Sequence, residues 1–382
     1  MATIRNVVLL GLTSLLTDIS SEMVYPLVPF FLTAVLGASP AMLGLIEGLA
    51  ESAASLLKVF AGVISDRMRK RKGLIIAGYG AAALGKLLLA LASGWGMVLA
   101  ARVVDRFGKG IRTAPRDALI ADSAHEDRRG RAFGLHRTLD TWGAVLGVGL
   151  GYWFFTRMPD QYTRVFLVAL VPAALGVLVL LAVRESRHEG PRVAPPSLGW
   201  SVLPRRLQFF LVISLLFALG NSSNAFLLLR AKSLGFTAAV AILLYGAYNV
   251  SYALSSYPVG RISDRIGRKT LLVAGYAFYG LVYLGFALLD GASMAWLAWA
   301  LFTLYGLYSG FTDGVEKALV SDLAPRQLRA TAIGLHGTLV GVGLFPASLI
   351  AGELWTWLGP ESTFYFGSAM GFLAALGLLL AL

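Results

Sequence analysis

Long apolar stretches recur along the whole chain, and they constrain its fold more than any other feature. A helix needs about 20 mainly apolar residues to cross the hydrocarbon core of a bilayer. The stretches that meet this length are 7–35, 40–65, 74–93, 95–122, 133–155, 164–183, 207–229, 237–259, 271–289, 293–323, 331–357 and 363–382. We therefore predict an all-α integral membrane protein with 12 transmembrane helices.

The composition agrees with this prediction, because 57% of the residues are apolar and only 14% are charged. Soluble domains are roughly 45–50% apolar and about 25% charged. The absence of cysteine removes disulfides and thiolate metal sites. The sequence also lacks a Gly-x-x-x-x-Gly-Lys-Ser/Thr loop, which argues against ATP as the energy source. We expect no catalytic residues, no bound metal and no cofactor, and hence not an enzyme.

The basic residues set the orientation in the membrane. The formal net charge of +12 does not indicate a nucleic-acid partner, because no basic domain stands apart from the apolar stretches. Alternate loops, at 67–72, 128–131, 184–206, 261–269 and 326–329, are rich in Lys and Arg. The opposite loops hold only Arg157, Arg164, Arg230 and Lys232. The positive-inside rule places both termini in the cytoplasm, and we expect a monomer in a bacterial-type inner (plasma) membrane.

A polar stretch with several prolines divides the chain into two matching halves. Residues 184–206 contain Pro191, Pro195, Pro196 and Pro204. Such a segment cannot continue a helix and indicates an inter-domain linker. On its two sides, 62–67 and 260–265 both read Gly-x-Ile-Ser-Asp-Arg, and 11 of 29 positions are identical between 110–138 and 310–338. This period near 200 fits two parallel, pseudo-symmetric six-helix bundles, 1–183 and 207–382, with a transport site between them.

The repeated loop also resembles a known family. Residues 260–269, Gly-Arg-Ile-Ser-Asp-Arg-Ile-Gly-Arg-Lys, look like the signature loop of the major facilitator superfamily, and 62–72 hold a second copy with Arg69 where the family usually has glycine. The chain is similar to this family over its whole length. The resemblance implies that two Asp–Arg pairs act as gating residues, which lock and release the cytoplasmic ends of the helices. These pairs are Asp66 with Arg67, and Asp264 with Arg265. The alternative is that these loops only set the topology.

Two further motifs resemble those of the 12-helix drug:proton antiporter branch of that family. Residues 106–110, Arg-Phe-Gly-Lys-Gly, look like its Arg-x-x-Gln-Gly motif, with lysine replacing glutamine. In relatives that arginine is associated with proton coupling. The glycine-rich antiporter motif is similar at Gly134, Gly143, Gly147 and Gly151, with departures at 148 and 152. This resemblance favours export, and glycines at such spacing also let helices pack closely.

Ionisable side chains inside the expected spans are concentrated in the N-terminal half. Each costs on the order of 2.5–3.5 kcal/mol on insertion scales, so each is expected to pair, to face water or to act in transport. At a rise of about 1.5 Å per residue, Asp18, Glu51 and Arg106 lie roughly 16 Å into their spans, near the bilayer midplane. A second layer is formed by Glu22, Glu47 and Arg102.

A carboxylate beside an arginine changes its proton affinity when the arginine moves away, so these residues are candidates for proton coupling. The coupling candidates are Asp18, Glu22, Glu51 and Arg106. The candidate substrate contacts in the same half are Tyr25, Arg102, Lys109 and Arg112. The alternative is that all of these charges form buried ion pairs that only fix the helix packing.

The matched positions of the C-terminal half are uncharged: Glu47 aligns with Tyr245, and Glu51 with Asn249. The candidate substrate contacts there are Asn221, Asn224, Tyr245 and Asn249. We infer charge handling in the N-terminal half, and hydrogen bonds or aromatic contacts in the C-terminal half. Ordinary helix packing is the alternative for the tyrosines. His136 and His336 stand at matched cytoplasmic helix ends, and we interpret them as features of those ends.

We expect a secondary active transporter that works by alternating access and uses the proton gradient to export a small organic molecule. A first alternative is an anion transporter that binds its substrate on the Arg/Lys stripe of 95–122. A second is a transporter of a hard cation, held by the carboxylates of the first two spans, because grouped oxygen ligands suit such ions. A receptor or scaffold without flux is a third. Beyond its substrate and protons, the expected partner is the lipid bilayer.

Overall fold

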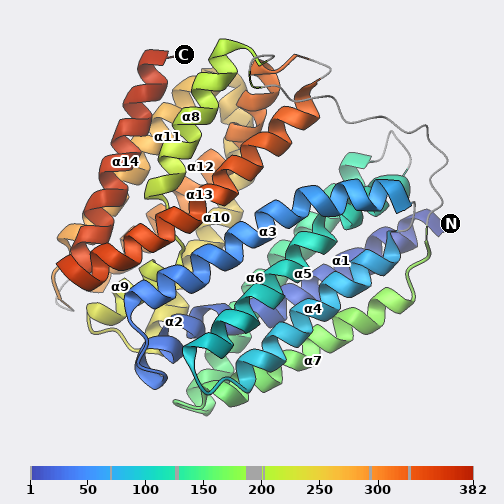
Figure 1. The fold of residues 1–382 in the computed structure, drawn as a ribbon, viewed down its shortest axis with the longest axis horizontal. Helices are drawn as coiled ribbons and strands as arrows, with labels where there is room; N and C mark the ends of the chain where they lie inside the picture. Colours follow the sequence, from blue (N-terminus) through green and yellow to red (C-terminus); the bar gives the residue numbers. More distant parts are fainter. Residues whose placement is uncertain are drawn as a thin grey trace. The chain divides into compact units, whose positions relative to one another are not determined.

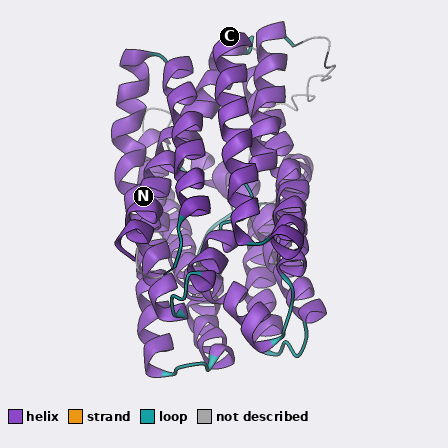
Figure 2. Cartoon of the chain, turned by 90° about the vertical axis from the view of Figure 1, so that its left-hand side faces the viewer, coloured by secondary structure: helices purple, strands orange, loops and turns teal. Residues whose placement is uncertain are grey.

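The computed structural model describes residues 2–68, 71–124, 129–185, 200, 203–291, 295–325 and 328–381. These residues are helical almost throughout, and they contain no strand (Figure 2). By internal contacts the chain divides into two compact units. The first unit is Met1–Ala38 with Leu49–Pro191, and the second is Ser39–Gly48 with Arg192–Leu382. The division at 191 falls inside the predicted linker 184–206, of which 186–199 and 201–202 lie outside the described residues.

The N-terminal part of the chain begins with an irregular span and continues through five long helices. The helix α1 (Ala2–Val24) is followed by the short turns η1 (Tyr25–Leu27), α2 (Val28–Phe30) and η2 (Phe31–Val35). This irregular stretch contains Pro26 and Pro29, which cannot donate a backbone hydrogen bond and so disturb the helix. The long helices are α3 (Pro40–Met68), α4 (Lys72–Ala90), α5 (Trp95–Asp122), α6 (Arg129–Arg157) and α7 (Tyr162–Leu181).

The described residues of the C-terminal part form seven helices: α8 (Arg205–Gly220), α9 (Ala225–Ser233), α10 (Ala238–Ile266), α11 (Arg268–Leu288), α12 (Ala295–Leu323), α13 (Arg329–Leu358) and α14 (Pro360–Ala381). The structure corrects the prediction of one continuous span over 207–229, because this span is broken between α8 and α9. The break has the sequence Asn-Ser-Ser-Asn, whose side chains compete for backbone hydrogen bonds. Accordingly, the Ser223 backbone N–H donates to Ser348 Oγ (3.2 Å), and its own Oγ accepts from the Ala225 N–H (3.3 Å).

Eight spans among the described residues are long and apolar enough to cross a membrane, counting 5–35 and the broken 205–233 as one each. The remaining four of the 12 predicted spans correspond to α3, α5, α6 and α12, which carry charged residues in their interiors. Charged residues in a transmembrane helix usually face the interior of the bundle or a water-filled cavity. Two of these four helices, α3 and α5, carry the candidate residues Glu51, Arg102, Arg106, Lys109 and Arg112.

The internal repeat predicted from the sequence is also a repeat of helix packing (Figure 1). In the first unit α1 packs against α6 and α7, and α4 packs against α5 and α7. In the second unit α8 packs against α13 and α14, and α11 packs against α12 and α14. These four pairs of equivalent helices thus pack in the same way in the two units, as expected for two copies of one six-helix bundle.

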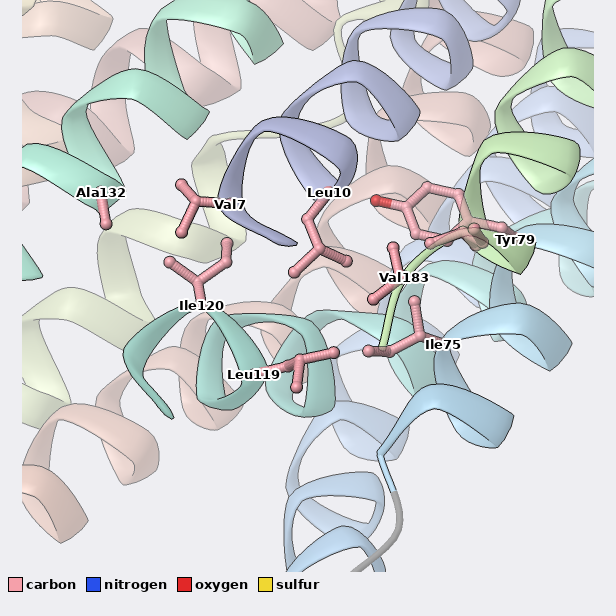
Figure 3. Close-up of a cluster of buried hydrophobic side chains, with 9 residues drawn as sticks. Val7, Leu10, Ile75, Tyr79, Leu119, Ile120, Ala132 and Val183 are labelled. Carbon is pink, nitrogen blue, oxygen red and sulfur yellow. The ribbon is translucent and has the colours of Figure 1, made fainter. Parts of the chain in front are cut away.

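A buried apolar cluster holds one end of the first unit together (Figure 3). Its members come from α1, α4, α5, the start of α6 and the end of α7: Val7, Leu10, Ile75, Tyr79, Leu119, Ile120, Ala132, Leu180 and Val183. Close to it, the Asn6 side chain bonds Ser123 Oγ (3.2 Å) and the Arg184 carbonyl (3.0 Å). Apolar packing and a small polar network therefore fix the ends of α1, α5 and α7 to one another.

The glycines of α6 allow a close contact between α6 and α1. A Cβ atom at Gly143 would lie 2.6 Å from the Leu15 carbonyl oxygen, and one at Gly147 would lie 2.7 Å from the Ile19 carbonyl oxygen. Gly151 continues the row, with Met23 Cα at 3.0 Å from its Cβ position. This row brings α6 against the same turns of α1 that carry Asp18 and Glu22. Gly134, at the other end of the motif, has nothing within 4 Å.

We expect Gly147→Ala to destabilise the first unit by about 1–3 kcal/mol, because the added methyl group would force α1 away from α6. Gly149→Ala is the matched control on the same helix, since nothing lies within 4 Å of its Cβ position. Thermal unfolding of the purified variants in detergent measures both effects. Equal midpoints for the two variants would show that the α1–α6 contact does not limit stability.

Candidate functional site

The helix α5 carries more charged residues than any other helix of the first unit, and its glycines allow neighbouring helices to approach. A Cβ atom at Gly110 would lie 2.7 Å from the Ala54 carbonyl oxygen of α3. This close approach places Arg106 beside Glu51, with Nε 2.9 Å from Oε1. The two side chains are 12% and 27% exposed, so the pair is largely shielded from the surroundings. The sequence placed both residues at the same depth, and the structure brings them together.

A second ion pair joins α4 to α5 and was missed by the sequence analysis. Lys86 Nζ lies 3.2 Å from Asp105 Oδ1, and the lysine side chain is only 4% exposed. Arg102 and Arg106 lie 3.8 and 4.0 Å from Asp105 Oδ2. One signal was available, because Lys86 is the only charged residue of the apolar stretch 74–93. Asp105 thus balances several cations at the centre of α5.

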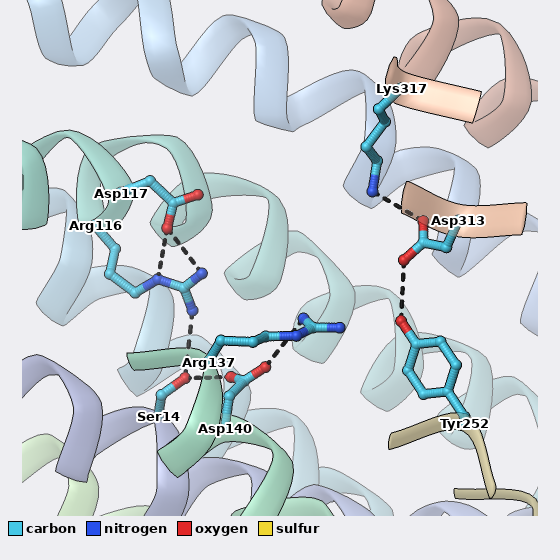
Figure 4. Close-up of polar contacts among 8 residues, drawn as sticks. All are labelled: Ser14, Arg116, Asp117, Arg137, Asp140, Tyr252, Asp313 and Lys317. Atoms are coloured by element: carbon cyan, nitrogen blue, oxygen red, sulfur yellow. Dashed lines mark hydrogen bonds and ion pairs between the residues drawn. The ribbon is translucent and has the colours of Figure 1, made fainter. Parts of the chain in front are cut away.

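A pair of carboxyl groups links α1 to α6. Asp18 and Asp140 lie close enough for a hydrogen bond between their side chains. Asp140 also accepts a hydrogen bond from Ser14 Oγ (2.7 Å) and lies 3.5 Å from Arg137 (Figure 4). A hydrogen bond between two carboxyl groups requires that one of them carries a proton. Asp140 was not a coupling candidate, because nothing in one sequence orients α6 toward α1.

The cations of α5 also act on this carboxyl pair. Lys109 and Arg112 are the nearby cations that act electrostatically on Asp18. Arg112 is buried, and its guanidinium lies 4.3 Å from the centre of the Tyr79 ring. Its Nη1 has no hydrogen-bond partner in the described part of the chain. Lys109 is exposed. The predicted stripe of α5 therefore acts on carboxylates from α1, α3 and α5 itself.

Two other predicted residues lie on the second half of α1 and directly after it. Glu22 packs against α6, with its Cβ 2.8 Å from the Cβ position of Gly147. Tyr25 is buried, and the Arg102 guanidinium lies 5.4 Å from the centre of its ring. This distance permits a cation–π interaction. Tyr25 and Arg102 therefore lie next to each other.

The second unit gathers amides and tyrosines around the break between α8 and α9. Tyr305 Oη donates to Asn224 Oδ1 (2.9 Å) and lies 3.4 Å from Asn221 Oδ1. The amide nitrogens of Asn221 and Asn224 bond Tyr308 and Tyr248 respectively, each at 3.3 Å. The partners from α12, Tyr305 and Tyr308, were missed, although their helical spacing to each other was a signal.

The other predicted residues of this unit lie on α10. The rings of Tyr245 and Tyr248 are tilted by 31° to each other, with their centres 5.4 Å apart. Asn249 donates from Nδ2 to the Tyr245 carbonyl (3.0 Å), a bond within its own helix. Further along α10, Tyr252 donates to Asp313, which also pairs with Lys317 (Figure 4).

The second unit also holds two buried charged residues, in addition to the amide and aromatic contacts inferred for it. Glu316 of α12 accepts a hydrogen bond from Tyr276 (2.9 Å), and its side chain is 14% exposed. Arg230 was assigned to a loop, but it is 2% exposed. It pairs with Glu361 (2.7 Å) and donates to the Leu289 carbonyl (2.7 Å). The free carbonyls at the end of α11 provide the physical reason, because a buried arginine can satisfy several of them.

The side chains of the predicted gating residues Asp66, Arg67, Asp264 and Arg265 lie outside the described residues. Next to them in sequence, two matched ion pairs are described. Arg71, before α4, pairs with Asp122 at the end of α5, and Arg268, at the start of α11, pairs with Asp322 near the end of α12. The two copies of the loop are therefore each followed by the same kind of link between helix ends.

Comparisons with known proteins agree with this architecture. The family model described as Major Facilitator Superfamily matches residues 10–312 and 209–382. MFS-type transporter MJ1317 of Methanocaldococcus jannaschii is 41% identical over 382 residues, which cover 98% of this chain and 94% of that protein. Multidrug resistance protein MdtH of Photorhabdus laumondii is 30% identical over 170 residues, which cover 44% of this chain and 40% of that protein.

Solved structures show the same fold at low sequence identity. The nucleoside transporter NupG superposes with a TM-score of 0.78 at 14% identity, covering 98% of this chain and 98% of that chain. A D-xylose-proton symporter gives 0.76 at 19% identity, covering 99% and 97%. With the family model and the 41% identical relative, these matches complete the assignment. The chain belongs to the major facilitator superfamily, and it is a multi-pass membrane transporter rather than an enzyme.

Proposed function

We propose that this protein is a proton-coupled secondary transporter that exports a small organic molecule by alternating access. The observation that carries the proposal is the contact between Asp18 of α1 and Asp140 of α6. Two carboxylates in contact repel each other, so one proton shared between the carboxyl groups stabilises the contact. Loss of that proton would weaken the contact between α1 and α6 and favour a different arrangement of the helices.

The cations of α5 give this carboxyl pair a second stable state. Arg112 lies in electrostatic reach of Asp18, and its Nη1 has no hydrogen-bond partner within the described residues. A deprotonated Asp18 can therefore exchange Asp140 for Arg112 without leaving a buried charge unpaired. Proton binding and release would then select between two sets of contacts, which is what coupling requires. Glu51 with Arg106, and Glu22 beside Gly147, are the other coupling candidates of this unit.

The direction of transport and the substrate region are further parts of the proposal. The partial likeness to a protein named for multidrug resistance supports export. The substrate would contact the amides and tyrosines at the break between α8 and α9, because aromatic rings and amides bind uncharged organic groups. The proton gradient supplies the energy without a cofactor. We place both termini in the cytoplasm and the protein, as a monomer, in a bacterial-type inner membrane, on the loop charges described above.

One observation favours a second candidate, an exporter of organic anions. Arg112 is buried, and its Nη1 has no hydrogen-bond partner among the described residues. It would bind a carboxylate of the substrate in place of the Asp18 carboxylate. Arg106, by contrast, already pairs with Glu51. For the hard-cation alternative, no group of three or more metal-ligating side chains was found among the described residues.

Reconstituted vesicles that contain a pH-sensitive dye test the proposal. The probes are a fluorescent organic cation, a nucleoside and an aromatic carboxylate, each added with and without an imposed proton gradient. We expect the transported probe to change the internal pH and the proton gradient to drive its accumulation against its own gradient. Vesicles without protein give the background rate.

The outcomes separate the candidate functions. Probe flux without any pH change, in either direction of the gradient, would overturn proton coupling. Transport of the carboxylate alone would favour the anion exporter. Binding of a probe without flux would favour a receptor or scaffold.

A further inference from the structure

The two units carry matched triads of polar side chains that differ in the sign of one charge. The segments 72–80 and 269–277 share Lys, Leu, Ala, Gly and Tyr at equivalent positions, which aligns Tyr79 with Tyr276. Between 110–138 and 310–338, the alignment equates Arg116 with Glu316 and His136 with His336. One repeat thus has arginine where the other has glutamate, between the same tyrosine and the same histidine.

In the first unit the triad consists of Tyr79, Arg116 and His136, and the charge of Arg116 is already neutralised by an acidic neighbour. Arg116 donates two hydrogen bonds to Asp117 Oδ1, at 3.0 and 2.9 Å, and a third to Ser14 (3.4 Å; Figure 4). It also acts electrostatically on Tyr79 and on His136, which is buried. Because an arginine keeps its charge in proteins, this triad cannot change its protonation at the central residue.

In the second unit the equivalent residue is a buried acid. Tyr276 Oη donates to Glu316 Oε1 (2.9 Å), and His336 Nε2 lies 3.5 Å from Oε2. Glu316 and His336 have side chains that are 14% and 5% exposed, and Tyr276 is fully buried. The His336 ring lies parallel to Phe210 of α8, with ring centres 5.8 Å apart. Each carboxylate oxygen thus faces its own partner, from α11 and from α13.

The charged groups near Glu316 are engaged elsewhere. The described titratable and charged groups that face this end of α12 are Tyr276 and Arg268 from α11, His336 from α13, Tyr252 from α10, and Tyr308, Asp313, Lys317 and Asp322 from α12 itself. Lys317 pairs with Asp313 at 2.8 Å, and Arg268 pairs with Asp322. Among the described side chains, no lysine or arginine lies within ion-pair distance of Glu316.

A carboxylate buried without a cation is costly, and binding a proton removes that cost. We infer that Glu316 is a proton-binding residue of the second unit, held by Tyr276 and lying beside His336. The place of this site in transport rests on the proposed function, whereas the site itself does not.

Infrared spectroscopy of the purified protein in lipid tests the inference directly, because a protonated carboxyl group has its own C=O stretching band. We expect a band whose intensity changes with pH, and we expect Glu316→Gln to remove the contribution of one carboxyl group. Glu353→Gln is the matched control, because Glu353 is an exposed glutamate of the same unit and bonds only Trp357 of its own helix in the described structure (2.9 Å). This control should leave the band unchanged.

Two further variants test the assigned partners and do not depend on the folding of Glu316→Gln. Tyr276→Phe removes one hydrogen bond from Oε1 and should shift the frequency of the band. His336→Gln should displace the pH at which the band changes. An unchanged band in Glu316→Gln, or unchanged frequency and pH response in both partner variants, would overturn the inference.

The result is independent of the transport assay. If the band is lost in Glu316→Gln but the wild-type vesicles move no protons with any probe, the proposed function fails and the proton site stands. If the vesicles couple transport to protons but the band does not respond to Glu316→Gln, the site fails and the proposed function stands.

Discussion

Lys86→Met is expected to destabilise the first unit by about 3 kcal/mol, within the 3–5 kcal/mol range for removing one partner of a buried ion pair. The physical reason is that Asp105 would keep a buried charge after losing the cation that bonds Oδ1 at 3.2 Å. Arg102 and Arg106 lie 3.8 and 4.0 Å from the other oxygen and compensate in part, which places the effect at the lower end. Unfolding in mixed detergent micelles, followed by circular dichroism, measures the difference.

Two companion variants make this prediction specific to burial. Lys86→Met with Asp105→Asn removes the carboxylate that the single variant leaves without its lysine, and should recover part of the loss; recovery is incomplete because Arg102 and Arg106 lose Asp105 as a counter-charge. Lys317→Met breaks an exposed pair with Asp313, whose side chains are 56% and 50% exposed, and should cost about 0–1 kcal/mol. A double variant that is less stable than Lys86→Met would contradict the assignment of a buried ion pair.

The architecture could be predicted from the sequence because the bilayer leaves few choices. Every backbone group must be bonded inside the apolar core of the membrane, so an apolar stretch of the right length has to be a helix. The repeat then followed from the matched segments on the two sides of the linker. The break between α8 and α9 was not predicted. The stretch 207–229 remains mainly apolar and long enough to span the bilayer even with Asn221 and Asn224 inside it.

Contacts within the candidate site could be predicted only where the depth of two residues in the membrane was enough to pair them. Glu51 and Arg106 lie at equal depth on helices that face each other, and they pair. Asp18 and Asp140 also meet, but that contact depends on how α6 is rotated about its axis. Depth along a helix comes from a count of residues, whereas rotation against a neighbour comes from tertiary packing.

Glu316 could have been found by a different comparison. The same alignment that matched the gate loops sets it opposite Arg116, where an acid replaces a base. Shared residues and the loss of charge in the second unit are other signals of the same repeat. A change of sign at one position of a repeat is a separate signal, and it marks a place where the two halves must differ in electrostatics.

Asp18→Asn is expected to reduce proton movement in the vesicle assay to the level of protein-free vesicles. An amide can still donate a hydrogen bond to Asp140, so the contact between α1 and α6 is retained, but it can neither bind nor release a proton near neutral pH. Transport would then be fixed in one protonation state, and exchange of labelled for unlabelled probe across the membrane should continue. The measurements are the dye signal for protons and the label for exchange, made on the same vesicles.

A proton shared between Asp18 and Asp140 also predicts the effect of replacing Asp140. If Asp18 and Asp140 act as one proton site, Asp140→Asn should cause the same loss, and the double variant should add nothing to it, because the effects of residues that act as a unit are not additive. Asp160→Asn provides the matched control at an exposed aspartate between α6 and α7, where φ is 59° and asparagine is equally tolerated. Coupled proton movement that persists in Asp18→Asn but disappears in Glu51→Gln would move the coupling site to the Glu51–Arg106 pair.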